Sequence, residues 1–437
     1  MRILCTGDLH IGRRPNWVPG GENAARHSAA SGWQHVVERA VELRVDLVVL
    51  TGDVVDRDNK FVEAFGAFER GLAELQEAGI GVCAVAGNHD YDVLPRIERN
   101  AEASHFHLLG AGGQWSRFVL SKDDRPILYV DGWSFPFAEV YEDPWMSYDL
   151  AEPDEKDVPR LGLLHTALDG GGSHYAPVAR AELAGSGHDA WVLGHVHAPE
   201  VMRPGGETVV VSAGSPQAMS FSEPGAHGVW LLELSGRGRV STTFIPLSSL
   251  RYDAVGVDVN GATSVAEVET RCFEAVRAHV KSIQSKTHAP SCLICRLRLK
   301  GRTAAHRDLG AWSARIAREI QIPVGRTVAS IEKVVIGTQP AIDVAALAAS
   351  GRNDAACRLA RVVSRLQDGS EAKVDGDLVE RATEAVMDVD AAGGYAALRG
   401  GGRRERDRAS KRARQLLVER GTALLDMLLA QREATEP

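Results

Sequence analysis

Residues 2–10 read Arg-Ile-Leu-Cys-Thr-Gly-Asp-Leu-His, an apolar run that ends in a glycine, a carboxylate and an imidazole. The pattern occurs twice more: the run 46–50 leads into Gly52-Asp53, and the run 81–85 leads into Gly-Asn-His-Asp at 87–90. Short apolar runs bounded by glycine predict buried strands. Because segments with apolar residues at helical spacing separate these runs, we expect a largely parallel sheet covered by helices.

Two helices are predicted between these strands. Ser31 is the expected N-cap of the first, whose apolar positions begin at Trp33. The second has an apolar face from Phe61 to Leu75, and Gly79 is its expected stop.

The pattern changes after about residue 115, where helices become few. Six strands joined by turn-rich loops are expected, and they predict a second, more antiparallel sheet packed face to face with the first. The segments are 118–120, 127–130, 161–164, 190–193, 208–211 and 229–234.

Three domains are predicted. Residues 1–250 form the α/β domain, and residues 253–340 form a small α+β unit with helices near 264–282 and 309–320 and a strand at 292–299. Residues 341–437 form a helical C-terminal region with a Gly-rich hinge at 393–402 and a last helix at 403–430.

The composition of the chain indicates its expected location in the cell, the role of its cysteines and where basic contacts could arise. No apolar run approaches the ~20 residues of a membrane span, and no signal peptide is recognisable, so we expect a cytoplasmic protein without membrane contact. The six cysteines are scattered, and the pair Cys292 and Cys295 lies in a strand-like run, which favours ordinary packing over a zinc or redox site. Residues 1–250 hold 20 Lys and Arg against 34 Asp and Glu, so any basic contact with nucleic acid must come from local patches, the C-terminal half or a partner.

Metal-binding residue types follow five predicted strands. Since ligands bind at the carboxyl ends of strands in open α/β folds, we expect these side chains to converge on one site. Carboxylates and imidazoles suit manganese, iron or zinc, and one carboxylate between two ions gives the geometry of a two-metal hydrolase. The candidates are Asp8, His10, Asp53, Asp56, Asn88, His89, Asp90, His165, His195 and His197.

These motifs resemble the calcineurin-like metallophosphoesterases, with their D-x-H, G-D-x-x-D, G-N-H-D, H and G-H-x-H pattern. Within that superfamily, residues 164–171, 194–200 and 212–225 are similar to the SbcD-type DNA exonucleases. The resemblance covers residues 1–250 and, less closely, a capping domain at 253–340. It implies a four-layer α-β-β-α sandwich with a small α+β capping domain and a helical C-terminal tail.

The resemblance also implies roles for single residues. Asp8, His10, Asp53 and His197 hold one ion, and Asp53, Asn88, His165 and His195 hold the other, with Asp53 as the bridge. His89 is the catalytic residue that approaches the phosphate and protonates the leaving oxygen, and Asp90 orients it. Asp56 and His174 are expected to help place the substrate. The cofactor is two divalent ions, with manganese expected and magnesium, iron and zinc open.

The expected function is that of a DNA nuclease subunit, which hydrolyses phosphodiester bonds with a water activated by two metals. A phosphodiesterase or phosphatase for a small molecule or protein is the alternative, and a scaffold without activity is disfavoured because no ligand is missing. DNA and an SbcC-like coiled-coil ATPase are the expected partners, and the oligomeric state is open, a homodimer included.

The last predicted helix combines basic residues with an apolar stripe. Residues 403–420 hold eight basic and three acidic residues, and Ala413, Leu417, Leu424 and Leu428 form the stripe. The stripe either docks on the chain's own core or binds the coiled coil of the ATPase, while the basic residues also leave direct DNA contact open.

Overall fold

A computed structural model describes residues 1–19, 24–56, 58, 62–100, 105–203, 208–284, 289–317, 319–369, 373–392 and 403–435. Phe61 and the predicted hinge at 393–402 lie outside these ranges. The structure divides into a first unit, residues 1–301 with 307–338, and a second unit, residues 302–306 with 339–437. The domain boundaries near residues 250 and 340 remain predictions.

The first sheet carries the three strands that open the chain. β1 pairs in parallel with β2, β2 with β3 and β3 with β4, whereas β11 runs antiparallel to β1. The late strand β11 therefore joins this sheet and not the second one. In spatial order the strands are β12 (Val240–Pro246), β11 (Gly228–Leu234), β1 (Arg2–Thr6), β2 (Leu47–Thr51), β3 (Gly81–Val85) and β4 (Phe106–Leu108).

The second sheet is mostly parallel, so the antiparallel sheet expected from the scarcity of helices was wrong. β6, β7, β8 and β10 pair in parallel, and only the edge strands β5 and β9 are antiparallel. The physical reason is that long loops, such as residues 134–159, provide the crossover that parallel strands need without a long helix. In spatial order the strands are β5 (Ser116–Lys122), β6 (Arg125–Trp133), β7 (Arg160–His165), β8 (Ala190–Gly194), β10 (Val209–Ser212) and β9 (Glu200–Met202).

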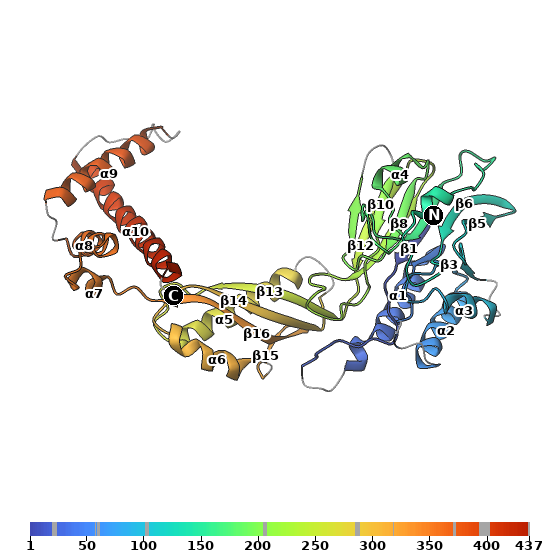
Figure 1. The fold of residues 1–437 in the computed structure, drawn as a ribbon, viewed down its shortest axis with the longest axis horizontal. Coiled ribbons are helices and arrows are strands. Elements are labelled where there is room, and N and C mark those ends of the chain that lie inside the picture. The colour runs from blue at the N-terminus through green and yellow to red at the C-terminus, as the bar shows by residue number, and fades with distance from the viewer. Residues whose placement is uncertain are drawn as a thin grey trace. The chain divides into compact units, whose positions relative to one another are not determined.

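The two sheets pack face to face, and this confirms the four-layer α-β-β-α sandwich (Figure 1). Buried residues of both sheets, such as Ile3 and Val49 from the first and Val130 and Leu163 from the second, share one core. On the outer face of the first sheet, α1 (Ala29–Leu43), α2 (Val62–Glu77) and α3 (Leu94–Asn100) form a second core. The outer face of the second sheet is covered by α4 (Arg180–Gly185), the turn η2 (Pro144–Ser147) and loops.

Two helix ends illustrate how local sequence sets these elements. The N-cap of α1 is Ser28, whose hydroxyl accepts a hydrogen bond from the amide of Ser31, so the cap lies three residues before the predicted one. Gly79 has φ +73° beyond the end of α2, a left-handed conformation that favours glycine and stops the helix as predicted.

A four-stranded sheet with two helices follows the sandwich, as expected for a small α+β capping domain. Cys292 and Cys295 are free and buried in strand β14 of this sheet, which fits ordinary packing. The elements are β13 (Leu250–Asp258), α5 (Val265–Gln284), β14 (Cys292–Thr303), η3 (His306–Asp308), α6 (Leu309–Ile316), β15 (Gln321–Val324) and β16 (Thr327–Pro340), after η1 (Ala24–His27) near the start of the chain.

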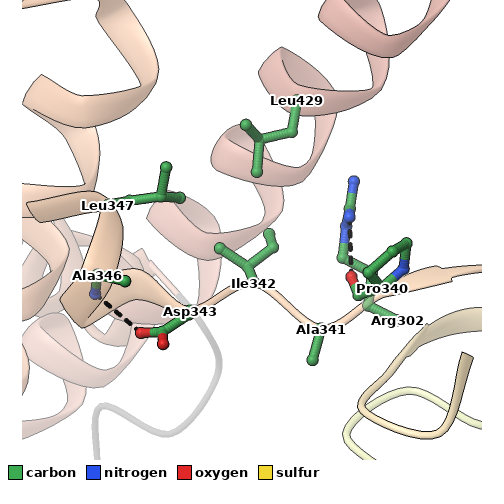
Figure 2. A pocket seen from close by; sticks show the side chains of 8 residues that line it. All are labelled: Arg302, Pro340, Ala341, Ile342, Asp343, Ala346, Leu347 and Leu429. Atoms are coloured by element: carbon green, nitrogen blue, oxygen red, sulfur yellow. Dashed lines mark hydrogen bonds between the residues drawn. The ribbon is translucent and has the colours of Figure 1, made fainter. Parts of the chain in front are cut away.

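The second unit is helical. It contains α7 (Val344–Ala349), α8 (Ala355–Asp368), α9 (Lys373–Ala392) and α10 (Arg403–Thr435). Figure 2 shows its beginning, where Arg302 donates to the Pro340 carbonyl at 3.0 Å and Asp343 caps α7 by accepting from the Ala346 amide at 2.8 Å. Leu429 of α10 lines the same cavity, which measures about 330 Å³.

Helix α10 packs against α8 and α9 of its own unit. Ala413 and Leu425 are fully buried there, whereas Leu424, which the sequence placed in the same stripe as Ala413, is 45% exposed. Part of the apolar stripe therefore packs inside the helical unit, and another part remains exposed at its surface. Among the described residues, no helix has the length and hydropathy needed to cross a membrane.

A buried ionic network ties the second sheet to the loop before β7. The carboxylate of Asp131 is fully buried and accepts from Arg117 at 2.6 and 2.8 Å, from the Tyr148 hydroxyl at 2.8 Å and from His188 at 3.0 Å. Burial alone raises the pKa of Asp131, but the hydrogen bonds from Arg117 and His188 outweigh it and hold the pKa well below its ordinary value.

This network predicts an acid-sensitive contribution to stability. Because the folded pKa of Asp131 is depressed, its contribution is full above pH about 4 and is lost as the pH falls toward the folded pKa. The change Asp131→Ala should cost about 3–5 kcal/mol at neutral pH, since it removes the buried carboxylate that pairs with the partly buried Arg117 guanidinium and with His188. Thermal unfolding measured from pH 7 to pH 3 should show a wild-type advantage that shrinks with acid; a difference independent of pH would contradict the linkage.

Candidate metal centre

Five strand ends meet at one edge of the sandwich. Asp8 and Asp53 follow β1 and β2 of the first sheet, Asn88 follows β3, and His165 and His195 stand at the ends of β7 and β8 of the second sheet. Backbone hydrogen bonds join the first two loops, because Asp8 donates to the Gly52 carbonyl at 3.0 Å and His10 to the Asp53 carbonyl at 2.8 Å. The motifs that are far apart in the sequence therefore form one cluster.

The side-chain donors of this cluster face one another closely. Nε2 of His10 lies 3.3 Å from Nε2 of His197, and Nε2 of His165 lies 3.1 Å from Oδ1 of Asn88. Oδ2 of Asp53 lies between them, 3.8 Å from His10 and 3.5 Å from His165. Three triads have donor atoms within 4.8 Å of one another, and they consist of Asp8, His10 and His197, of Asp8, Asp53 and His165, and of His10, Asp53 and His89.

These distances fit ligands that share divalent ions. Donor atoms that each lie about 2.0–2.2 Å from one tetrahedral ion are about 3.3–3.6 Å apart, a range that includes the 3.3 Å between the His10 and His197 nitrogens. Two ring nitrogens that point at each other have no reason to approach so closely without a shared proton or cation. The cluster is a binuclear His/Asp centre in its donor chemistry.

The backbone of the cluster is held in an unusual conformation. Asp8, His10, Asp53 and His195 all have positive φ, at 49°, 48°, 51° and 88°, and they are four of the nine such non-glycine residues in the described chain. Left-handed backbone is costly for side chains other than glycine and concentrates at functional sites. Gly87 provides the close approach beside them, since a Cβ there would lie 2.2 Å from Oδ1 of Asp53.

Backbone and carboxylate groups around the cluster fix the imidazole rings. Nδ1 of His165 lies 2.9 Å from the Thr51 carbonyl, so its Nε2 is the atom turned to the centre. Nδ1 of His197 lies 2.7 Å from Glu223, which also accepts from the Met219 amide at 2.7 Å. Such carboxylate–imidazole pairs orient metal ligands. Glu223 was not predicted as a site residue, although it lies in the stretch 212–225 that resembles the nuclease branch.

His89 and the two neighbouring acids take different positions. Nδ1 of His89 lies 3.6 Å from Asp56, and Nδ1 of His10 lies 3.4 Å from the same carboxylate. Burial lowers the pKa of His89, but the nearby carboxylates of Asp56 and Asp53 together outweigh it, so the pKa lies above its ordinary value. Asp90 is instead fully buried and accepts from the amides of Val54 and Gly87 at 2.6 and 2.8 Å.

Asp90 therefore holds two site loops together, and the carboxylate beside His89 is Asp56. Asp56 is itself buried and pairs with Arg13 at 2.6 Å, which suits a positioning group better than a contact to substrate. His174 lies outside the cluster, with its ring 4.0 Å from that of Tyr175, and the Tyr175 ring lies 4.7 Å from that of His195.

Comparisons with known proteins agree with this geometry. Residues 1–199 match a family model described as calcineurin-like phosphoesterase, and residues 252–339 match one described as the middle domain of the metallophosphoesterase YhaO. The chain is 28% identical over 282 residues to "Uncharacterized metallophosphoesterase YhaO" of Bacillus subtilis, covering 63% of this chain and 65% of that protein.

Two further relatives carry names from DNA metabolism. The chain is 24% identical over 285 residues to "DNA double-strand break repair protein Mre11" of Methanopyrus kandleri, covering 62% of each protein. It is 33% identical over 90 residues to the SbcD component of the nuclease SbcCD of Escherichia coli, covering 21% of each. The chain spans less than two thirds of the length of each of these three relatives.

Proposed function

Because residues 1–199 form a calcineurin-like metallophosphoesterase domain, we propose that this metal-dependent phosphoesterase is a DNA nuclease. The observation that carries the proposal is a similarity over 285 residues to a protein named for DNA double-strand break repair. That length exceeds the phosphoesterase domain, so the likeness extends beyond the parts that all phosphoesterases share. A phosphodiester is also the substrate that a binuclear centre suits.

The distances among the donor atoms of His10, His197, Asn88, His165 and Asp53 support the proposed ligand sets. Asp8, His10 and His197 hold one ion, and Asn88, His165 and His195 hold the other, with Asp53 shared by both. His195 is placed by its amide, which donates to the Asp8 carboxylate at 3.0 Å, and its ring lies 5.5 Å from that of His165. Manganese is the proposed metal, because the donors mix carboxylate oxygen, amide oxygen and imidazole nitrogen.

One of the chain's own residues acts on the substrate's leaving group, and a second residue positions it. When bound, the two cations lower the pKa of a water molecule and neutralise phosphate charge. His89 points into the same space and, in its protonated form, donates a proton to the leaving oxygen. Asp56 keeps that ring charged and oriented, and we assign it this positioning role in place of Asp90.

The change Asp56→Asn tests this assignment. The amide preserves the shape but removes the charge beside His89 and His10, so we expect kcat to fall about 10–100-fold. The alkaline limb of the pH–rate profile should move to lower pH, because the pKa of His89 falls when the imidazolium loses its stabilising carboxylate. An Asp90→Asn variant should instead lower the melting temperature, and an effect of Asp90 on the pH profile larger than that of Asp56 would reverse the assignment.

A phosphodiesterase for small molecules is the second candidate. It is favoured by the acidic character of residues 1–250, whose net charge of −14 disfavours a polyanion. Purified protein with manganese should be assayed on labelled duplex and single-stranded DNA and on bis(p-nitrophenyl) phosphate. Cleavage of DNA supports the nuclease; hydrolysis of the small diester without any cleavage of DNA favours the second candidate.

The helical second unit is the proposed partner-binding part. An apolar cavity of about 310 Å³ lies between α9 and α10, lined by Val386, Val389, Leu416 and Leu417 and flanked by Arg412 and Arg420. Val389 is 72% exposed and Leu416 39% exposed. An amphipathic, acidic helix from the coiled coil of an SbcC-like ATPase has the chemistry to fill this groove.

Charge substitutions in the groove test the partner more cleanly than removal of α10, which would uncover α8 and α9. The double change Val389→Asp and Leu416→Asp should abolish co-purification with the ATPase but leave the melting temperature within a few degrees, because both side chains are exposed. A matched double change of the exposed residues Val119→Asp and Val335→Asp in the first unit is the control. Undiminished co-purification of the groove variant would exclude this surface.

A further inference from the structure

A series of aromatic rings leads from the metal centre to the protein surface. The ring of His195 lies 4.7 Å from that of Tyr175, the Tyr175 ring 4.0 Å from that of His174, and the His174 ring 5.9 Å from that of Tyr141. The last ring is 63% exposed. We name the side chains of Tyr175, His174 and Tyr141 the aromatic rim.

The rim is fixed by the backbone. The amide of Val140 donates to the His174 carbonyl at 2.9 Å, and the amide of Ala176 donates to the Val140 carbonyl at 2.8 Å. Val140 itself is buried in the core on the outer face of the second sheet. Tyr141 and His174, which are 33 positions apart in the chain, are therefore held side by side without a ligand.

The acidic residues around Tyr141 restrict which chemical groups can bind at the aromatic rim. Its hydroxyl donates to Glu139 at 3.0 Å, and Glu142 and Asp143 follow it directly. Such a surface repels a phosphate backbone, but it leaves a flat π face open to solvent. A nucleobase is flat and uncharged and stacks on aromatic side chains without regard to its identity.

We propose that the aromatic rim stacks an unpaired base of a single-stranded segment whose scissile phosphate lies at the metal centre. This inference rests on the proposed nuclease function and names its substrate as a strand with accessible bases. Paired bases inside an intact duplex present only their edges, so the rim favours frayed ends, loops and single strands. The acidic side chains beside Tyr141 direct the bases toward the rim and the phosphates away from it.

The test compares two oligomers that differ only in their bases. A thymidine oligonucleotide and an abasic oligomer of the same length compete at initial rates with hydrolysis of bis(p-nitrophenyl) phosphate in the presence of manganese. The thymidine oligomer should inhibit about 5–150-fold more strongly, the range expected for one stacked base. In Tyr141→Ala the ratio of the two inhibition constants should fall close to one.

Two control variants should keep the wild-type ratio of inhibition constants. Tyr141→Phe retains the aromatic ring. Met146→Ala changes an 82% exposed side chain of the same loop that is not part of the aromatic rim. A disturbance of the metal centre would weaken both oligomers alike and leave the ratio intact. The ratio should also be insensitive to salt, because stacking releases no counterions.

The outcomes separate this inference from the proposed function. A ratio near one in the wild type, or an unchanged ratio in Tyr141→Ala, overturns the stacking role even if DNA is cleaved. Hydrolysis of the small diester without DNA cleavage refutes the nuclease, and the ratio then still reports whether the rim takes a base. If the diester proves a poor substrate, fluorescence anisotropy of labelled oligomers on the manganese-loaded protein gives the same ratio.

Discussion

Replacing Asp53 by asparagine should empty both metal positions and abolish hydrolysis. Oδ2 of Asp53 lies 3.8 Å from Nε2 of His10 and 3.5 Å from Nε2 of His165, so its charge lies between donors of the two proposed ligand sets. Bound metals lower the pKa of water to about 7. Their loss should therefore exceed the about 10²–10⁴-fold that one general acid contributes.

Elemental analysis of the purified variant measures this directly, with about two ions per chain in the wild type and none in Asp53→Asn. The asparagine keeps the hydrogen bond that Oδ1 of Asp53 accepts from the His89 amide at 2.9 Å, so the fold should survive. Asp169→Asn is the matched control, since Asp169 also has positive φ, at 56°, but lies outside the cluster. One ion retained in Asp53→Asn would show that the carboxylate serves a single site.

The change His89→Ser should separate binding from chemistry. His89 lies near Asp56 and Asp53. It directly follows the proposed ligand Asn88 in the sequence, but we do not propose it as a ligand. We expect the variant to keep both ions and to lose about 10²–10⁴-fold in kcat on DNA, as for a missing general acid. The loss should be smaller on bis(p-nitrophenyl) phosphate, because nitrophenolate leaves without a proton.

The adjacent residue gives the contrast. Asn88→Ala removes an oxygen 3.1 Å from Nε2 of His165 and should lose metal, whereas His89→Ser should not. Loss of metal from the His89 variant would make His89 a ligand. Equal losses on both substrates would mean that His89 stabilises the phosphate charge without donating the proton.

Much of the site could be predicted because its functional side chains come directly after strands. Asp8, Asn88 and His165 each follow an apolar run, and parallel strands bring such ends to one edge. The glycines that precede the motifs signal the tight turns. No comparable local signal marks Glu223, which reaches His197 only because its loop folds back across the centre.

Other features depend on which strands become neighbours. β11 was expected in the second sheet, but it pairs with β1 and extends the first sheet. The parallel order of β6, β7 and β8 was also missed, because the loops between them do not carry the helical pattern that usually announces a parallel crossover. The spacing of apolar residues indicates that a strand is buried, but it does not indicate which strand it pairs with.

By itself, the amino-acid sequence determined the α/β character of the first domain, the donor residues and their order along the chain, because backbone periodicity and ligand chemistry are local properties. Only the tertiary structure decided that Asp56 and not Asp90 stands beside His89, and that Tyr141 stands beside His174. A carboxylate's role depends on which side chain it contacts. Loops from two different sheets pack together to make these contacts, and no local sequence pattern encodes that packing.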